Sequence, residues 1–327
     1  MGSAGGLGET RKAHAPGPRA GVARGTGPFS LASLFVPLSL LTLVRNRTGL
    51  LCDLLSTLAR NPDPPREVIV GVSGGEDPRP HVPETPFPVH FLDVGSDGDR
   101  IRYSLARNAC ARAATSPHLL FLDADCLPAP GALAAFADVL ETRDTLAIGE
   151  VRYLRPGTHD LADPNALRAA SLPHPARPVP PASGWEPSDA YEMVWGLCIG
   201  IRRETFERLG GFDTSYGGYA GEDTDLAIAA REAGVPLAVV AATVFHQHHD
   251  VFEPPLQQVE ATLANAQRFR EKWGWWPMGG WLDAYARLGL VDWTPDAERA
   301  TLLRQPTAEE IESARHTIAR PFRMAQA

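Results

Sequence analysis

Two acidic residues separated by one residue end an apolar run in the stretch LLFLDADCLPAP, at positions 119–130. On an extended strand, Asp123 and Asp125 project to the same side. Their carboxylates repel each other unless positive charge lies between or beside them. A divalent cation supplies that charge, and oxygen ligands favour Mg²⁺ or Mn²⁺. Such a cation would bridge the acids to a nucleotide diphosphate and neutralise it as a leaving group. The alternative is a strand-end turn with two solvated acids.

A run of histidines, HQHH at 246–249, ends another apolar segment. Alternation along a strand places His246 and His248 on one face and His249 on the other. Imidazole binds Mn²⁺ together with carboxylates. We therefore expect at least one of these histidines to meet the metal or the diphosphate, although a lone histidine at such a place is more often structural.

A third group of acids follows a glycine-rich stretch in GGYAGEDTD, at 217–225. Glu222, Asp223 and Asp225 fall in the first turn of a predicted helix, where acids interact favourably with the helix dipole. Three acids exceed what capping requires. One of them is a candidate general base, which must lie within about 3 Å of the proton that it removes. The glycines would let the loop close over a substrate and exclude water.

Arginines and tryptophans form two further clusters with two interpretations each. Arg45 and Arg47 end the first predicted strand and are suited to bidentate contacts with a pyrophosphate, unless they are a solvated helix start. The aromatic stretch WGWWPMGGW, at 273–281, either packs a helical cap onto the sheet or places one Trp against the C–H face of a sugar.

Apolar runs alternate with helical patterns along the first half of the chain. This alternation implies a parallel sheet with helices on both faces. Ligands bind such sheets at the carboxyl ends of the strands, where the Asp123–Asp125 pair falls. The predicted strands are 38–44, 67–72, 89–94, 119–125 and 146–153, and the predicted helices are 48–60, 100–115 and 131–141.

The second half is predicted to contain a long loop at 155–190, a strand, turn and helix over 193–213, a helix beginning at Glu222, and a buried strand over 236–250 that finishes in three histidines. A loop of that length in a compact domain is more often functional than idle. The organisation is then a disordered tail at 1–28, one domain at 29–255 and a helical extension at 256–327.

Composition limits the classes of partner. The 327 residues carry a net charge of −8 with a pI of about 5.7, so a general attraction to nucleic acid is not expected. The four cysteines are far apart, which excludes a cysteine zinc site and indicates reduced thiols in a cytoplasm. The apolar segment 29–44 follows a basic tail like a signal or anchor, but it contains Pro37 and is short of the ~20 residues of a span. We predict a buried strand there and no transmembrane segment.

The order and spacing of these motifs resemble a GT-A-fold glycosyltransferase of the family 2 type over residues 30–255. The second half is similar to the galactosyltransferase family 7 carboxy-terminal region. The resemblance implies an α/β fold, with a Rossmann-like, mostly parallel sheet flanked by helices and a C-terminal helical extension.

The resemblance also implies a role for each matching position. The donor-binding residues would be Arg45, Arg47, Asp123, Asp125 and Gly196. Asp125 would be the principal metal carboxylate, with His246 as the metal histidine and His248 as its competitor. Asp223 would be the catalytic base, and Glu222 would help to hold the acceptor.

Three family features are changed in this chain. The acid that commonly binds uracil after the second strand is missing at Val72 and Ser73, which leaves Glu76, Asp77 or Asp93 as substitutes. The tryptophan of the mobile loop is replaced by Tyr219, and no methionine metal ligand is present near Thr243.

These patterns together predict a metal-dependent inverting glycosyltransferase of the hexosyltransferase type, using Mn²⁺ or Mg²⁺. The expected partners are a nucleotide-sugar donor, with UDP preferred, and a glycan, lipid-linked or small-molecule acceptor, with a peripheral membrane contact left open. The alternatives are a nucleotidyltransferase or metal-dependent hydrolase that uses the same acids, and a non-catalytic nucleotide-sugar binding module.

Overall fold

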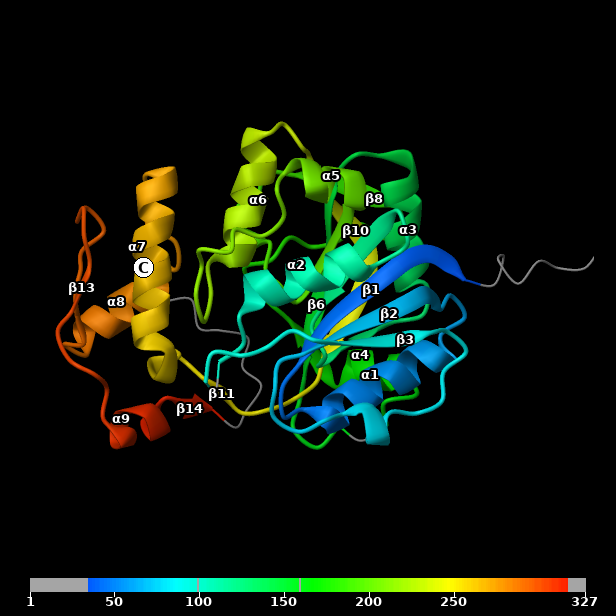
Figure 1. The fold of residues 1–327 in the computed structure, drawn as a ribbon, viewed down its shortest axis with the longest axis horizontal. Coiled ribbons are helices and arrows are strands. Elements are labelled where there is room, and N and C mark those ends of the chain that lie inside the picture. Colours follow the sequence, from blue (N-terminus) through cyan, green and yellow to red (C-terminus); the bar gives the residue numbers. More distant parts are fainter. Residues whose placement is uncertain (1–34, 99, 159, 317–327) are drawn as a thin grey trace, which may run out of the picture.

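A computed structural model describes residues 35–98, 100–158 and 160–316, and Figure 1 shows the fold. The predicted tail at 1–28 lies outside these residues, as does the beginning of the apolar segment that follows it. Within the described part, none of the helices combines the length and apolarity that crossing a bilayer requires.

One large sheet forms the centre of the molecule. Its strands are β1 (Val36–Val44), β2 (Pro65–Val72), β3 (Val89–Asp93), β4 (His118–Leu122), β5 (Cys126–Pro128), β6 (Leu146–Leu154), β7 (Ser171–Pro173), β8 (Trp185–Ser188), β9 (Cys198–Arg202) and β10 (Leu237–His246). Among the described residues the order is β3-β2-β1-β4-β9-β6-β10-β5, with β7 paired to β6 and β8 paired to β10.

The helices lie mainly on the two faces of this sheet and in the C-terminal region. They are α1 (Thr48–Arg60), α2 (Tyr103–Ala113), α3 (Ala132–Thr142), α4 (Pro164–Ala169), α5 (Arg203–Arg208), α6 (Glu222–Glu232), α7 (Val259–Trp273), α8 (Gly279–Arg287) and α9 (Ala308–Ser313). Two small antiparallel pairs complete the C-terminal region: β11 (Val251–Phe252) with β14 (Arg315–His316), and β12 (Val291–Asp292) with β13 (Thr301–Leu302).

The strand directions confirm the predicted α/β fold with a mostly parallel central sheet, to which antiparallel strands are added. Strands β3, β2, β1 and β4 are parallel, as are β6 and β10. Strand β9 is antiparallel to both β4 and β6. The reason is its point of entry: Leu197 O accepts a hydrogen bond from Asp123 N at the carboxyl edge of β4, so β9 has to run back toward the opposite edge.

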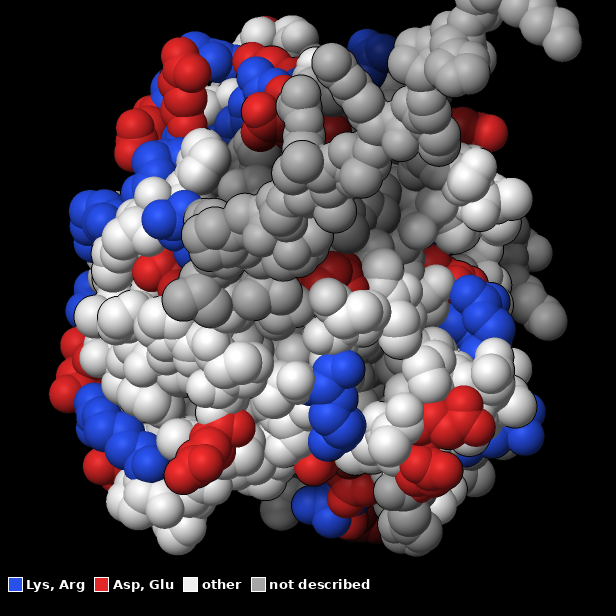
Figure 2. Space-filling model, turned by 90° about the vertical axis from the view of Figure 1, so that its right-hand side faces the viewer, with Lys and Arg blue, Asp and Glu red and all other residues white. Residues whose placement is uncertain are grey.

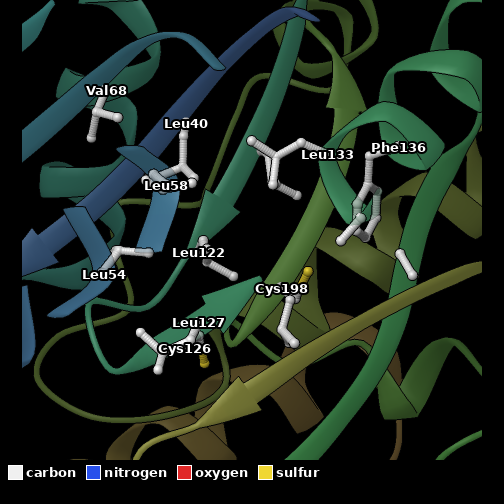
Figure 3. Packing of buried hydrophobic residues seen from close by; sticks show 14 of the residues in the cluster. Leu40, Leu54, Leu58, Val68, Leu122, Cys126, Leu127, Leu133, Phe136 and Cys198 are labelled. Atoms are coloured by element: carbon white, nitrogen blue, oxygen red, sulfur yellow. The ribbon is translucent and has the colours of Figure 1, made fainter. Parts of the chain in front are cut away.

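Consecutive residues of the central strands pack into two different cores. Leu40 of β1 lies in the core beneath α1 and α3, whereas Leu41 lies in the core beneath α2, α5 and α6. Figure 3 shows Leu54 and Leu58 of α1, together with Phe136 of α3, in the first of these cores. Because both faces are covered, the central strands are mostly apolar, and this is why they were recognisable in the sequence.

The segment 155–190 is less irregular than predicted. It contains the short elements α4, β7 and β8, and its Arg152–Ser171 and Arg168–Glu150 contacts fasten it to β6. The prediction of a long loop is therefore wrong in part, because these elements are too short to show a periodic pattern.

The C-terminal extension has its own small core but shares α7 with the main body. Leu263, Leu282 and Tyr285 belong to the extension's core. Phe269 of α7 is instead completely buried in the core beneath α2, α5 and α6. Figure 1 shows α7 beside α6. The division at residue 255 remains a prediction about sequence organisation.

Charged side chains of both signs are interspersed on the face shown in Figure 2, which lies at the right of Figure 1. In the described part of this face, Lys and Arg form no continuous field. This distribution agrees with the modest net negative charge of the chain.

Candidate active site

A cavity of about 210 Å³ opens at the carboxyl edge of the sheet. The ends of β1 and β4 form one side of it, and the glycine-rich loop before α6 contributes to another. Its polar lining includes Arg45, Arg47, Arg100, Asp123, Asp125 and Tyr219. The structure thus brings together the predicted arginines, the acid pair and the glycine-rich loop, and it adds Arg100, for which the sequence carried no motif.

Asp125 lies between two imidazoles. His246 Nε2 is 3.6 Å from Asp125 Oδ1, and His249 Nε2 is 3.2 Å from Asp125 Oδ2. One ligand atom from each of these three residues lies within 4.8 Å of the others. His248, the second histidine of the predicted set, is half-buried and lies outside this group. Strand alternation failed to find His249 because β10 ends at His246, so its period does not extend to residue 249.

The hydrogen bonds of His249 show that the group fits a cation. His249 Nδ1 is 2.9 Å from the carbonyl oxygen of Asp250, so Nδ1 carries the proton and donates it. In the neutral ring, Nε2 then presents a lone pair toward the Asp125 carboxylate. Two electron-pair donors in contact require positive charge, and Arg47 Nη1 provides it at 2.6 Å from Asp125 Oδ2 and 3.2 Å from His249 Nε2. One carboxylate and two imidazoles form a donor set compatible with Mn²⁺.

Electrostatics around Asp125 favour the metal-binding forms of these residues. Burial opposes ionisation of Asp125, but the charge of His246 in its protonated form, a hydrogen bond donated by His249 when it too is protonated, and the Arg47 guanidinium outweigh it and lower the pKa of the carboxyl. Burial is also the main reason why the pKa of His246 is lowered, which favours the neutral ring that a metal binds.

Arg107 of α2 connects the two acidic motifs. Its Nη1 donates to Glu222 Oε1 at 2.6 Å, and its Nη2 lies 3.5 Å from Asp123 Oδ1. Arg107 is only 5% exposed, so these interactions are poorly screened. No motif in the sequence singled out this residue. A signal was available, because Arg107 shares helical spacing with Tyr103 and Cys110 on the buried face of α2.

The acids around Arg107 are harder to ionise than free carboxyls. Burial and the nearby Asp223 raise the pKa of Glu222, Arg107 opposes both effects, and the resulting pKa is about 7. Burial likewise raises the pKa of Asp123 to about 6, against the charge of Arg107. At neutral pH this corner therefore holds carboxyls close to their titration range.

Gly196 has a role in packing and hydrogen bonding, in addition to its predicted role in donor binding. Its backbone N–H donates to Asp223 Oδ2 at 2.7 Å. A Cβ at this position would collide with the Arg107 guanidinium, so a larger residue would have to displace Arg107 from its ion pairs. Gly196 consequently orients both Asp223 and Arg107. Asp223 is half-buried, whereas Glu222 is buried and ion-paired.

Asp225, the third acid of the motif, is held by the C-terminal extension. Its oxygens accept hydrogen bonds from Tyr216 Oη at 3.0 Å, Lys272 Nζ at 2.8 Å and Trp273 Nε1 at 2.7 Å. Only 2% of Asp225 is exposed. These contacts fasten α6 to α7, and they explain the third acid without a direct role in chemistry.

The acids that could bind the uracil of a donor, which follow β2 or end β3, are paired with neighbouring side chains. Asp93 and Asp77 both contact Arg79, and Glu76 accepts a hydrogen bond from Thr48. Ser73 is buried, and its carbonyl oxygen accepts a hydrogen bond from Arg45 Nη1 at 2.5 Å. Arg45 is thereby fixed between the ends of β1 and β2.

The tryptophan cluster packs against other aromatic side chains, and the alternative of a Trp beneath a sugar stays a prediction. Trp275 packs edge-on against Phe269, and Trp276 against Trp293, as expected for a packed cap. Trp281 instead stacks on Tyr219 of the glycine-rich loop, with ring centroids 6.0 Å apart. Tyr219 therefore occupies the predicted position in the loop and is supported from the extension.

Comparison with known proteins identifies both motif-bearing regions. The model for "Glycosyl transferase family 2" matches residues 39–209, and the one described as "N-terminal domain of galactosyltransferase" matches residues 178–250. These matches confirm the resemblance predicted from the motifs.

Two curated relatives are named Validoxylamine A glucosyltransferase. That of Streptomyces hygroscopicus subsp. limoneus is 30% identical over 274 residues, covering 75% of this chain and 59% of the relative. That of Streptomyces hygroscopicus subsp. jinggangensis (strain 5008) is 29% identical over 270 residues, covering 74% and 62%. The chain therefore spans about three fifths of the length of these relatives. A crystal structure of GalNAc-T7 with UDP, GalNAc and Mn²⁺ is 16% identical, with a TM-score of 0.48 over 65% of this chain and 43% of that one.

Proposed function

The chain belongs to glycosyl transferase family 2, and from this premise we propose that it is a metal-dependent inverting glycosyltransferase. It moves a sugar from a nucleotide-diphosphate donor to an acceptor hydroxyl. The observation that carries the proposal is the arrangement around one cavity, which joins arginines, an Asp–His cation group and the loop that leads to two further acids. UDP is the preferred nucleotide. Because both curated relatives are named glucosyltransferases, glucose is the first donor sugar to test.

In this proposal Asp125, His246 and His249 hold the cation, with His249 in place of His248. A bound Mn²⁺ or Mg²⁺ supplies positive charge that stabilises the departing diphosphate. Arg45 and Arg47 bind the same diphosphate from the end of β1 and add charge that does not depend on a metal.

Proton transfer is assigned to the acids of the glycine-rich motif. Asp223 accepts the proton of the acceptor hydroxyl as that oxygen attacks the anomeric carbon from the face opposite the diphosphate, so a single displacement inverts its configuration. Glu222 binds the acceptor while Arg107 holds its side chain. Support for this division comes from exposure, because Asp223 is half-buried whereas Glu222 is buried in an ion pair.

The direct test is a titration of Mn²⁺ and of nucleotide sugars by calorimetry, beside a turnover assay with and without EDTA. Asp125→Ala and His249→Ala should weaken Mn²⁺ binding at least tenfold, because each removes one of three ligands. His248→Ala is the matched control and should bind Mn²⁺ like the parent. Full turnover in EDTA contradicts metal dependence, and release of free sugar without transfer to any acceptor favours a hydrolase.

A further inference from the structure

The glycine-rich loop before α6 has an unusual backbone. Gly218, Ala220 and Gly221 have φ values of 69°, 71° and 97°, all in the left-handed region. Glycine adopts such values freely, but in Ala220 the Cβ makes this conformation unfavourable. A non-glycine residue remains there only where its surroundings enforce the conformation. Some contact outside the loop must therefore hold it.

Asn265 of α7 provides that contact. Its Nδ2 donates to the carbonyl oxygens of Gly217 at 2.8 Å, Tyr219 at 3.1 Å and Ala220 at 2.8 Å. Its Oδ1 accepts from Gly217 N at 3.2 Å. Only 3% of Asn265 is exposed, so water does not compete for these bonds. A side-chain amide is required, because it alone combines two donor hydrogens with an acceptor at this length.

The loop also packs closely against α7, and this contact sets the distance between the loop and the helix. A Cβ placed on Gly218 would come within 2.9 Å of Ala261 Cβ on α7. Directly after the loop, Gly221 leads into Glu222 and Asp223, and Tyr219 lines the cavity. The loop residues that Asn265 bonds therefore lie between two and five positions before Glu222.

We propose that Asn265 is a positioning residue, which holds the glycine-rich loop so that Asp223 and Tyr219 face the substrates. It lies in the C-terminal extension, beyond residue 250, where both family matches have ended. The extension thereby becomes part of the catalytic apparatus. The kinetic half of this inference rests on the proposed glycosyltransferase function, whereas its structural half does not.

Amide hydrogen exchange of the full chain without substrates tests the structural half. Asn265→Ala should accelerate exchange across 217–221, while exchange in α1 stays unchanged. Gln267→Ala is the matched control: Gln267 is an amide on the same helix, and its hydrogen bonds within the described part of the chain go to Glu271, Glu298 and Ala300 instead of the loop. Unchanged exchange in Asn265→Ala, or equal acceleration in Gln267→Ala, overturns the proposal.

Steady-state kinetics test the positioning role. Asn265→Ala should lower kcat roughly 10- to 100-fold, the range expected when a reacting group is displaced by about 1 Å. The KM for the donor should change less than about twofold, since the arginines and the cation group are not altered. A kcat within twofold of the parent, despite faster loop exchange, refutes positioning.

A second variant guards against misfolding of Asn265→Ala. Asn265→Asp has nearly the same volume and keeps an acceptor for Gly217 N, but it loses the amide donors that bind three carbonyl oxygens. It should show the same faster exchange and the same loss of kcat; parent-like behaviour in a folded Asn265→Asp overturns the proposal. If the parent itself shows no sugar transfer, the proposed function fails, and hydrogen exchange still decides whether Asn265 holds the loop.

Discussion

At the scale of single residues, two arginines organise the acids of the site. Arg47 approaches Asp125 to 2.6 Å, and Arg107 lies between Asp123 and Glu222. Their environments differ, since 45% of the Arg47 side chain is exposed and only 6% of the Arg107 side chain. Arg47 can therefore exchange partners with a diphosphate at small cost, whereas moving Arg107 would leave buried charges unpaired. We assign ligand binding to the former and support of the site to the latter.

The first prediction concerns the catalytic base. Asp223→Asn preserves shape and can still accept the Gly196 N–H bond, but it cannot take a proton. We expect kcat to fall roughly 10²- to 10⁴-fold, the usual range for loss of a general base, with donor affinity nearly unchanged. Glu222→Gln should mainly raise the KM for the acceptor. Kinetics beside donor titration measure both; an inactive Glu222→Gln with a near-normal Asp223→Asn would show that the two roles are exchanged.

The second prediction concerns pH and stability. The pKa of Glu222 rises from 4.5 to about 7 in the folded protein, chiefly through burial. The folded state then binds this proton more tightly than the unfolded chain, so the free energy of unfolding should fall as pH increases from 4.5 to about 7. Glu222→Gln removes the titrating carboxyl, so the free energy of unfolding measured in urea should depend less on pH. Asp123, whose pKa is raised to about 6, contributes to the same slope, so part of it should remain. An unaltered slope in the variant would show that Glu222 is not buried as described.

At the scale of elements, the site depends on close approaches between the segment before β9, helix α2 and the start of α6. Gly196 donates to Asp223 and leaves room for Arg107. The same segment before β9 determines the antiparallel direction of that strand, because the chain must enter the sheet at its carboxyl edge. One glycine thus links the topology of the sheet to the orientation of two functional side chains.

This close approach gives the third prediction. Gly196→Ala should destabilise the protein by about 1–3 kcal/mol, as other overpacking substitutions do, because its methyl group displaces the Arg107 guanidinium. Gly49→Ala is the matched control: no atom lies within 4 Å of the added Cβ, and it replaces a glycine in helix α1. It should stabilise the protein by up to about 1 kcal/mol. Urea unfolding measures both, and equal effects of the two substitutions would contradict the collision.

At the scale of the whole molecule, the C-terminal extension supports the main body through α7. Asn265 binds the loop, Lys272 and Trp273 bind Asp225, and Phe269 enters a core of the sheet domain. An extension with a separate core of its own therefore still contributes to the stability and geometry of the site. A chain shortened to residue 255 should consequently lose stability and site geometry in the main body as well as the extension itself.

The fourth prediction tests this dependence with one side chain. Phe269→Ala should destabilise the protein by roughly 3–5 kcal/mol, the usual cost of removing a buried aromatic ring. Leu303→Ala is the control within the extension; Leu303 is 60% exposed, and its loss should cost less than about 0.5 kcal/mol. Thermal and urea unfolding give both values. A small effect of Phe269→Ala, or a separate unfolding transition for the extension, would show that the two parts are energetically independent.

The amino-acid sequence by itself determined the elements that have a regular apolar period and the motifs that end them. Helix α1 occupies the predicted residues 48–60, whereas the strand predicted at 119–125 ends at Leu122, so that Asp123 and Asp125 lie in the turn that follows it. Such features depend on neighbours within a few residues, so a linear pattern contains the necessary information. The same holds for the order of the motifs, from which the family resemblance was predicted.

Only the tertiary structure decided which side chains meet. His249 rather than His248 lies beside Asp125, because the chain leaves the strand geometry after His246. Arg107 reaches Glu222, and Asn265 reaches the glycine-rich loop, across long stretches of sequence. Contacts of this kind depend on where separate elements pack against one another and on the direction in which the chain re-enters the sheet. A local periodic pattern contains no information about these packing positions or about this direction, so only the tertiary structure shows them.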